Sequence, residues 1–548
     1  MSDAQVAHDH HEPTYLSHKE IVPILIGLMT GLFLAALDQT IVATSIRTIG
    51  DELQGLSVQA WVTTAYLITS TITTPLYGKL SDIFGRKPLF IWAISLFVVG
   101  SALSAFSTSM FMLAGFRAVQ GLGAGGLFTM ALSIIGDIVP PRERAKYQGY
   151  FIAVFGSSSV LGPVVGGFLA GQESILGLAG WRWVFFVNVP IGLVALFVVN
   201  RTLHIPNFKK VDHALDWFGA LSLTIALVPM LLVAEEGRTW GWTSFNAMLC
   251  YALIVGGITW FIRTESKMGD EALIPLRLFK DKTFSLMTVI GVITGMGMFG
   301  GLAVLPLYLQ IVLGSSPTQA GLQLLPLTLG IMGGSIISGQ LITKLGRYKM
   351  FPVMGIILLT VTLASMTTIT ADTAFFVVAI MSGFFGLGLG FILQPTVLAV
   401  QNAVSPRDIG VATSSVTLFR QLGATLGTAI FLSLLFGRLG DSVAARFTTA
   451  YGTAEYQAAL TDPANAATAQ KLGELQTAGA SAFDDTSWLA TANQTLIRPI
   501  FDGFTDTTSV VFAVGAAVLA VGIIFVVKLP NLRLRGRDEA FKQGGVAH

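Results

Sequence analysis

Two oppositely charged residues of this 548-residue chain lie inside long apolar stretches, where ionised side chains are rare. Asp38 falls in the apolar range 22–46 and is the only acidic residue in the middle of any such range, and Arg117 falls in the range 111–135. A carboxyl group that moves between apolar surroundings and a cation changes its affinity for protons. We therefore predict that Asp38 carries protons and that Arg117 is its cationic partner.

The two residues meet only if both ranges are helices that cross the same membrane. A helix rise of about 1.5 Å per residue places Asp38 about 12 Å and Arg117 about 9 Å below the outer membrane face. Similar depth favours a pair, and the alternative is that Arg117 contacts only backbone carbonyls or water. Arg420, in the range 409–436, has no obvious acidic partner in the sequence. For Arg420, helix packing and the lining of a cavity are equally open interpretations.

A further charged group occupies residues 78–88, which read GKLSDIFGRKP and join the second and third apolar ranges. Gly78 allows a neighbouring helix to approach closely. Asp82 can face a cation or a helix N-terminus, and Arg86 can reach a carboxylate. We interpret the segment as a gate whose contacts form when the inner side is closed. Its predicted residues are Gly78, Asp82, Gly85, Arg86 and Lys87. A positive anchor at the membrane surface is the alternative, but it leaves the glycine and the aspartate unexplained.

The composition places these groups in a membrane protein. Of all residues, 53% are hydrophobic and only 12% are charged, with a mean hydropathy of +0.70, whereas a soluble domain is about one-quarter charged. A soluble enzyme is therefore excluded. The one cysteine, Cys250, excludes a disulfide framework or a multi-cysteine metal site. The balance of 33 Lys and Arg against 31 Asp and Glu offers no basic face for nucleic acid.

Fourteen apolar ranges have the length of about 20 residues that a helix needs to cross a bilayer. They are 22–46, 58–77, 88–107, 111–135, 147–169, 184–203, 215–234, 244–262, 284–309, 320–342, 350–370, 374–400, 409–436 and 508–528. If the N-terminus is inside, the inner segments carry 24 Lys and Arg residues and the outer segments carry 7. Because positive residues are retained on the cytoplasmic side, we predict that both termini are cytoplasmic.

An internal repeat divides the chain. Gly78, Leu80, Gly85 and Arg86 recur 261 residues later as Gly339, Leu341, Gly346 and Arg347, and the glycines at 121, 123 and 125 recur at 386, 388 and 390. We predict an all-α polytopic membrane protein of two pseudo-symmetric six-helix bundles with two inserted helices. The predicted parts are an N-terminal tail (1–21), an N-terminal bundle (22–203), an inserted hairpin with its linkers (204–283), a C-terminal bundle (284–528) with a polar outer loop of short helices (437–507), and a C-terminal tail (529–548).

The motifs resemble those of a known family. Residues 78–88 look like the signature loop of the major facilitator superfamily. Four more segments add matches: LDQTIV at 37–42, Arg117 with Gln120 and Gly121, GPVVGG at 162–167, and WRWVFFVNVP at 181–190. Together with fourteen spans, they resemble the fourteen-helix drug:proton antiporter branch, to which bacterial multidrug exporters belong. The resemblance weakens at 43–47 and in the outer segment 437–507.

The resemblance implies further roles. The residues Gly156, Gly162, Pro163, Gly166 and Gly167 match an element that this family associates with antiporters, and a generic Gly-Pro kink is the alternative. The substrate cavity of such proteins is lined by the first and fourth helix of each half. Its candidate residues here are Gln120, Met296, Met298, Phe299, Tyr308, Phe384, Phe385, Gln394 and Arg420. Thioethers and aromatic rings suit promiscuous apolar recognition, but they are equally typical of a lipid-facing surface.

We therefore expect a proton-coupled exporter of amphiphilic or lipophilic small molecules, such as drugs and biocides, that works by alternating access. It is expected to be no enzyme, to use no cofactor or metal beyond the coupling proton, and to act as a monomer among the lipids of a bacterial plasma membrane. The chain has no P-loop, HExxH or GxSxG sequence. An exporter or flippase of an endogenous lipid or metabolite is the alternative within transport. A receptor or scaffold that does not transport is the second alternative.

Overall fold

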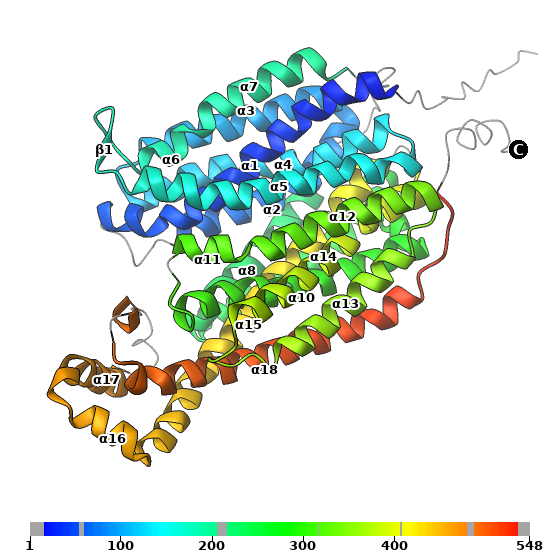
Figure 1. Cartoon of the computed structure of the whole chain (residues 1–548). Helices are drawn as coiled ribbons and strands as arrows, with labels where there is room; N and C mark the ends of the chain where they lie inside the picture. Colours follow the sequence, from blue (N-terminus) through cyan, green and yellow to red (C-terminus); the bar gives the residue numbers. More distant parts are fainter. Residues whose placement is uncertain are drawn as a thin grey trace, which may run out of the picture.

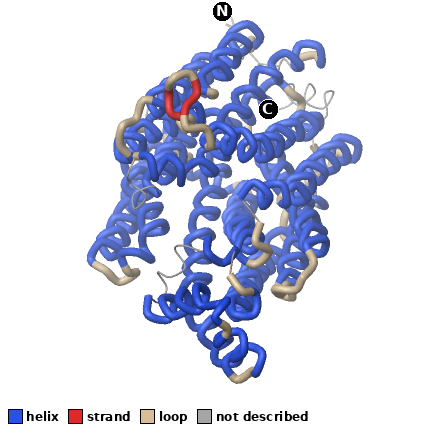
Figure 2. Tube along the Cα trace, turned by 60° about the vertical axis from the view of Figure 1, so that its left-hand side comes forward, coloured by secondary structure: helices blue, strands red, loops and turns tan. Residues whose placement is uncertain are grey.

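The computed structural model describes residues 16–53, 60–204, 216–315, 317–405, 408–478, 487–490 and 492–534, and the structural statements below concern these residues. Most of the two predicted tails lies outside them. Helices make up nearly all of the described chain, and Figure 2 shows one short hairpin of strands among them. The hairpin pairs β1 (Ser174–Ile175) with β2 (Leu178–Ala179) in antiparallel register.

Two helical bundles lie side by side in Figure 1. The N-terminal bundle contains α1 (His18–Glu52), α2 (Ala60–Phe84), α3 (Arg86–Ala105), α4 (Met110–Ile138), α5 (Pro141–Ala170), α6 (Arg182–Phe186) and α7 (Asn188–Thr202). The C-terminal bundle contains α10 (Lys282–Ile311), α11 (Pro317–Gln323), α12 (Leu325–Leu345), α13 (Met350–Met366), α14 (Phe375–Ala403), α15 (Ile409–Tyr451) and α18 (Gln494–Val527). Each bundle has its own apolar core. Across the seam, α2 packs against α15 and α5 packs against α12.

The predicted insertion forms a separate helical pair. The helices α8 (Trp217–Trp240) and α9 (Phe245–Met268) pack against each other, and α8 also contacts α2 and α15. The short helices η2 (Gly269–Glu271) and η3 (Leu276–Lys280) connect this pair to α10. The pair therefore lies beside the seam between the two bundles.

Each predicted span overlaps helix in the described residues, and eleven of the described helices are long and apolar enough to cross a membrane. Two spans differ from a continuous helix. The range 184–203 breaks between α6 and α7, and the range 320–342 breaks between α11 and α12. Both breaks precede a proline by two or three residues, Pro190 and Pro326 respectively. Proline has no backbone N–H for the preceding turn, so the helix is interrupted there.

The repeated glycines perform the same packing task in both bundles. A Cβ on Gly121 or Gly125 of α4 would collide with backbone of α2. In the C-terminal bundle, a Cβ on Gly386 or Gly390 of α14 would collide with backbone of α12. The glycines remove the side chain where two helices approach most closely. The internal repeat of the sequence is therefore also a repeat of helix contacts.

The outer segment 437–507 is more helical than the sequence indicates. Helix α15 continues to Tyr451, and α18 begins at Gln494, so both extend beyond the predicted spans. Between them lie α16 (Ala454–Thr461), η5 (Pro463–Asn465), α17 (Ala466–Ala478) and η7 (Ser487–Ala490), which project from the bundle in Figure 1. Arg498 binds Asp372 and Asp502 at the base of this extension, and its hydrogen bonds to Asp372 hold the pKa of that carboxyl below its ordinary value.

Glycine substitutions on α4 test the packing of the bundle. Gly121→Ala should lower the free energy of unfolding by about 1–3 kcal/mol, because the added methyl overlaps α2. Gly115→Ala on the same helix is the matched control, since no atom lies within 4 Å of its would-be Cβ. Thermal unfolding of the two purified variants in detergent measures the difference. Equal unfolding temperatures would contradict the packing role of Gly121.

Candidate functional site

Asp38 lies at the centre of a buried polar cluster in the N-terminal bundle. Arg117 Nη1 donates to Asp38 Oδ2 over 2.5 Å, and Gln120 Nε2 donates to Oδ1 over 2.9 Å. Asn188 Nδ2 also donates to Oδ1, over 2.8 Å. The side chain of Asp38 is 0% exposed and that of Arg117 is 2% exposed. The contact expected from helix depth is therefore present, and both oxygens of the carboxylate accept hydrogen bonds.

Three helices supply this cluster, namely α1 with Asp38, α4 with Arg117 and Gln120, and α7 with Asn188. Arg117 and Gln120 are three residues apart on α4, so they share one helix face. Arg117 Nη1 also donates to Gln120 Oε1 over 2.6 Å. The guanidinium carbon lies 4.2 Å from the centre of the Tyr66 ring, which contributes a cation–π contact from α2.

The sequence analysis did not assign Asn188 or Ser101 to the site. Asn188 is the first residue of α7, directly after the break in the span, and its Nδ2 also donates to Ser101 Oγ over 3.0 Å. Ser101 Oγ in turn donates to the carbonyl of Phe185. The one sequence feature that could have indicated Asn188 is its amide side chain, which lies within the otherwise apolar second half of the motif at 181–190. Asn188 therefore ties α1 to α3 and to the broken helix.

The antiporter-type residues of α5 face two different neighbours. A Cβ on Gly162 would collide with Thr40 of α1, and one on Gly166 would lie 2.8 Å from the carbonyl oxygen of Ile41. On another face, a Cβ on Gly156 would lie 2.8 Å from the sulfur of Met332 in α12.

Pro163 and Gly167 complete the description of this helix. Pro163 lies 3.4 Å from the would-be Cβ of Gly321 in α11, whereas Gly167 is exposed. Helix α5 thus packs against the helix of Asp38 and against the opposite bundle at the same time.

The gate residues lie at one end of the seam, called the gate end below. Arg86 Nη2 lies 2.6 Å from Asp82 Oδ1, and its Nε donates to Asp137 Oδ2 of α4 over 2.7 Å. Asp82 in turn adjoins the N-terminus of α15, because a Cβ on Gly410 would lie 2.5 Å from Asp82 Oδ1. The N-terminus of a 43-residue helix favours a negative charge beside it. Asp82 and its partner Arg86 therefore lie at the contact between the two bundles.

Other glycines and cations of the gate segment have distinct contacts. A Cβ on Gly78 would lie 2.7 Å from Ser414 Cβ of α15, so this glycine permits the close contact of α2 and α15. Gly85 adopts φ of 98°, a conformation that favours glycine, and caps α3. Lys87 Nζ donates to the carbonyl of Asn200 over 2.7 Å and so joins α3 to α7 within one bundle.

A second polar contact crosses the seam and was missed from the sequence. Gln148 Nε2 of α5 donates to Gln401 Oε1 of α14 over 3.3 Å. Gln401 Nε2 donates to the carbonyl of Leu132 in α4 and to the hydroxyl of Thr413 in α15, each over 3.1 Å. Gln148, inside the apolar range 147–169, and Gln401, one residue beyond the range 374–400, gave no signal of their partners. Asp137 was missed as well, since it lies just beyond the predicted fourth span.

The predicted cavity residues do not form one group. Tyr308 is buried in the C-terminal core and donates to the carbonyl of Thr370, and Phe385 is buried there too. Phe384 is 51% exposed on the outer surface of its helix.

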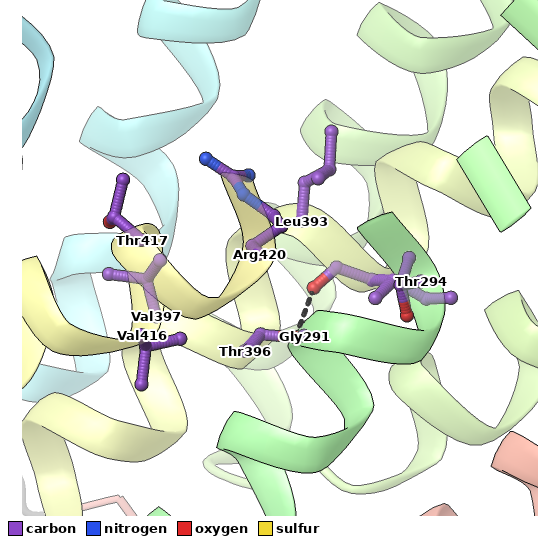
Figure 3. Close-up of a pocket in the computed structure, with 9 residues that line it drawn as sticks. Gly291, Thr294, Leu393, Thr396, Val397, Val416, Thr417 and Arg420 are labelled. Carbon is purple, nitrogen blue, oxygen red and sulfur yellow. Dashed lines mark hydrogen bonds between the residues drawn. The ribbon is translucent and has the colours of Figure 1, made fainter. Parts of the chain in front are cut away.

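The remaining candidates are placed as follows. Met296 and Met298 of α10 are partly buried, and the side chain of Phe299 lies outside the described part of the structure. Gln394 is buried, and its amide nitrogen and oxygen have no hydrogen-bond partner among the described residues. Arg420 lines a small cavity with Gly291, Thr294, Ile392, Leu393, Thr396, Val397, Val416 and Thr417, drawn in Figure 3. The described residues contain no group of three or more potential metal ligands.

Two similar helical bundles with a polar seam define the fold of a multi-pass membrane transporter. The sequence profile described as Major Facilitator Superfamily matches residues 28–428, and the chain belongs to that family. It is 32% identical over 528 residues to the multidrug transporter protein MdtP of Bacillus subtilis (strain 168), covering 95% of each chain.

Two further comparisons agree with this family. The chain is 36% identical over 412 residues to multidrug resistance protein 3 of Bacillus subtilis (strain 168), covering 74% of this chain and 78% of the relative. Among solved structures, the proton:xylose symporter XylE bound to 6-bromo-6-deoxy-D-glucose matches with a TM-score of 0.58 at 15% identity, covering 96% of this chain and 100% of XylE. At that identity, the structural likeness concerns the fold.

Replacement of Asp82 tests the contact at the gate end. Asp82→Asn removes the charge that faces the N-terminus of α15, so the gate end should open in a larger fraction of molecules. Spin labels are attached at Phe84→Cys and Leu345→Cys in a Cys250→Ser background. Double electron–electron resonance then measures the distance between the two labels, and so the separation of the bundles. Both label sites are exposed, one on each bundle.

Asp462→Asn is the control for that experiment, because it makes the same chemical change in the projecting segment. The control should retain the distance distribution of the parent protein. An unchanged distribution in Asp82→Asn would remove Asp82 from the gate.

Proposed function

We propose that this protein exports amphiphilic or lipophilic small molecules in exchange for protons, with Asp38 as the proton carrier. The observation that carries the proposal is the fully buried carboxylate of Asp38, held by Arg117, Gln120 and Asn188. A carboxylate in the apolar part of a membrane protein needs partners to remain ionised. When a proton neutralises Asp38, the charge-assisted hydrogen bond from Arg117 is weakened and the cation loses its counter-charge.

Loss of that counter-charge supplies a reason for conformational change. Removing one partner of a buried ion pair costs about 3–5 kcal/mol, which is enough to shift an equilibrium between two bundle arrangements. The contacts of α5 support coupling, since its glycines pack against α1 beside Asp38 and against α12 across the seam. Proton binding at Asp38 is thus proposed to alter the seam between the two bundles. Alternating access to the outer and inner sides follows from that change.

The substrate class is proposed from the relatives and from the cavity. Two relatives carry names that include multidrug, and the apolar side chains of Ile392, Leu393, Val397 and Val416 form part of the cavity wall beside Arg420. Apolar walls with few polar groups accept diverse amphiphilic molecules. Drugs and biocides are therefore the first substrates to test. An endogenous lipid or metabolite would use the same route.

The membrane setting of the proposal follows from charge. The excess of Lys and Arg in alternate segments supports a cytoplasmic position for both termini, and the relatives from Bacillus subtilis point to a bacterial plasma membrane. The gate end, which carries residues 78–88, would then be cytoplasmic. One chain contains both bundles and the seam between them, so a monomer is proposed to be the transporting unit.

Asp38→Asn tests proton coupling. The variant should lose ethidium accumulation driven by a proton gradient in everted vesicles, because the amide neither binds nor releases a proton in this range. Asp372→Asn is the matched control, since it makes the same change at an exposed position and should transport like the wild type. Monodisperse protein in detergent shows that the variant still folds. Wild-type, protonophore-sensitive accumulation by Asp38→Asn would contradict the proposal.

A double-mutant cycle tests whether Arg117 acts through Asp38. Arg117→Gln alone should strongly reduce gradient-driven transport and the free energy of unfolding, because it leaves a buried carboxylate without its cation. Added to Asp38→Asn, the same change should cause a smaller further loss of stability. Thermal unfolding of the four proteins gives the coupling energy. Losses that simply add would assign Arg117 to substrate contact or packing.

A further inference from the structure

Arg420 is a cation within the apolar part of α15 that has no described carboxylate beside it. The arginines 86, 117, 277, 446 and 498 each lie within ion-pair distance of an aspartate. Arg420 has no such pair and no hydrogen bond among the described residues, and Figure 3 shows no acidic side chain among the labelled residues around it. An arginine in the centre of a membrane helix is costly to insert and is rarely left without a partner. Its retention therefore calls for a partner.

The helices around Arg420 offer no acidic partner. Helices α10 and α14, which line the cavity with α15, contain no Asp or Glu. The acidic residue within α15 is Asp441, about 30 Å farther along the helix. On the facing helix α4, Asp137 is already bound to Arg86. Among the described residues, no carboxylate thus lies within ion-pair distance of Arg420.

The surroundings leave the guanidinium open to a ligand. Its carbon lies 5.7 Å from the centre of the Phe128 ring of α4, which belongs to the opposite bundle. A ring on one side of a guanidinium leaves N–H groups at its edge free to donate. The side chain is partly exposed, and it borders the small cavity drawn in Figure 3.

A second donor lies in the same cavity. The hydroxyl of Thr294 in α10 is buried and has no hydrogen-bond partner among the described residues. A buried hydroxyl without a partner is destabilising, so a ligand oxygen there would satisfy it. The hydroxyls of the two other lining threonines, Thr396 and Thr417, already donate to backbone carbonyls. The remaining lining side chains, such as Leu393, Val397 and Val416, are apolar. A cation, an unpaired hydroxyl and an apolar wall fit a molecule with an anionic head and an apolar body.

We infer that the cavity at Arg420 binds the anionic group, a carboxylate or a phosphate, of an amphiphilic substrate. Arginine binds both groups through two parallel N–H donors, and Thr294 supplies a third donor. The inference deepens the proposed export function, on which it rests, by naming the charge of a substrate class. Because Phe128 belongs to the other bundle, a ligand at Arg420 would lie at the seam that has to move during transport.

Binding to the purified full-length protein tests the inference without requiring transport. The probe is a dansyl-labelled undecanoic acid, and its primary amide has the same chain without the charge. The wild type should bind the acid more tightly than the amide. Arg420→Gln should weaken binding of the acid about tenfold or more and leave the amide unchanged, since a hydrogen bond to a charged group is lost. Arg420→Lys should restore part of the preference, and Thr294→Val should lower it by a smaller factor.

Arg438→Gln is the matched control, because it makes the same change at an exposed position of the same helix. It should bind both probes like the wild type. Equal affinity of the wild type for acid and amide would overturn the inference. So would a loss of amide binding in Arg420→Gln that equals the loss of acid binding, because the residue would then support the fold and not the charge.

Two further experiments, a transport assay and a lipid competition assay, separate this inference from the proposed function and identify the source of the anion. If Arg420→Gln transports ethidium like the wild type but transports the acid more slowly, the inference is supported. Wild-type vesicles that transport neither compound would refute the export function, whereas a binding preference for the acid would still support the anion site. Competition with phosphatidylglycerol identifies the source of the anion. If this lipid displaces the acid from the wild type but does not change the residual binding of the acid to Arg420→Gln, the site binds a lipid phosphate.

Discussion

Burial of the Asp38 carboxylate is the constraint on which the arrangement of the N-terminal bundle depends. A charge removed from water must be paired and hydrogen-bonded, and here Arg117, Gln120 and Asn188 supply the partners. These partners come from α4 and α7, so one carboxylate fixes the relative positions of three helices. A change in its charge is consequently felt by all three. The glycines of α5 extend this dependence, because they hold α5 against α1 on one side and against the C-terminal bundle on the other.

The two bundles share helix packing but differ in their charges. Glycines at 121 and 125 and at 386 and 390 allow the same close contact in each bundle. In contrast, Arg117 of the N-terminal bundle has its aspartate, while Arg420 of the C-terminal bundle borders a cavity without one. This asymmetry supports a division of labour, with proton binding in the first bundle and substrate recognition in the second. The gate contact of Asp82 with the N-terminus of α15 joins the two parts.

Several features could be predicted because they follow from local chemistry. An acid within an apolar helix requires a cation at a similar depth, which was enough to pair Asp38 with Arg117. Asn188 lies 150 residues from Asp38, and an amide carries no charge that would reveal its partner. The contact between Gln148 and Gln401 spans 253 residues for the same reason. The helix breaks at Val187 and Leu324 could not be predicted from the prolines that follow them. Proline does not always break a helix here, because Pro163 lies within the continuous helix α5. Helices α15 and α18 pack against each other and continue beyond their apolar ranges. Hydropathy alone does not predict this extension, because the added residues are polar as well as apolar.

Proton release on substrate binding tests the central role of Asp38 most directly. Purified protein in a weakly buffered detergent solution near neutral pH is mixed with ethidium, and a pH indicator records the protons that appear. The account predicts release from the wild type and none from Asp38→Asn, because the carboxyl group that exchanges the proton is gone. Release of as many protons by Asp38→Asn as by the wild type, at equal ethidium binding, would contradict the account.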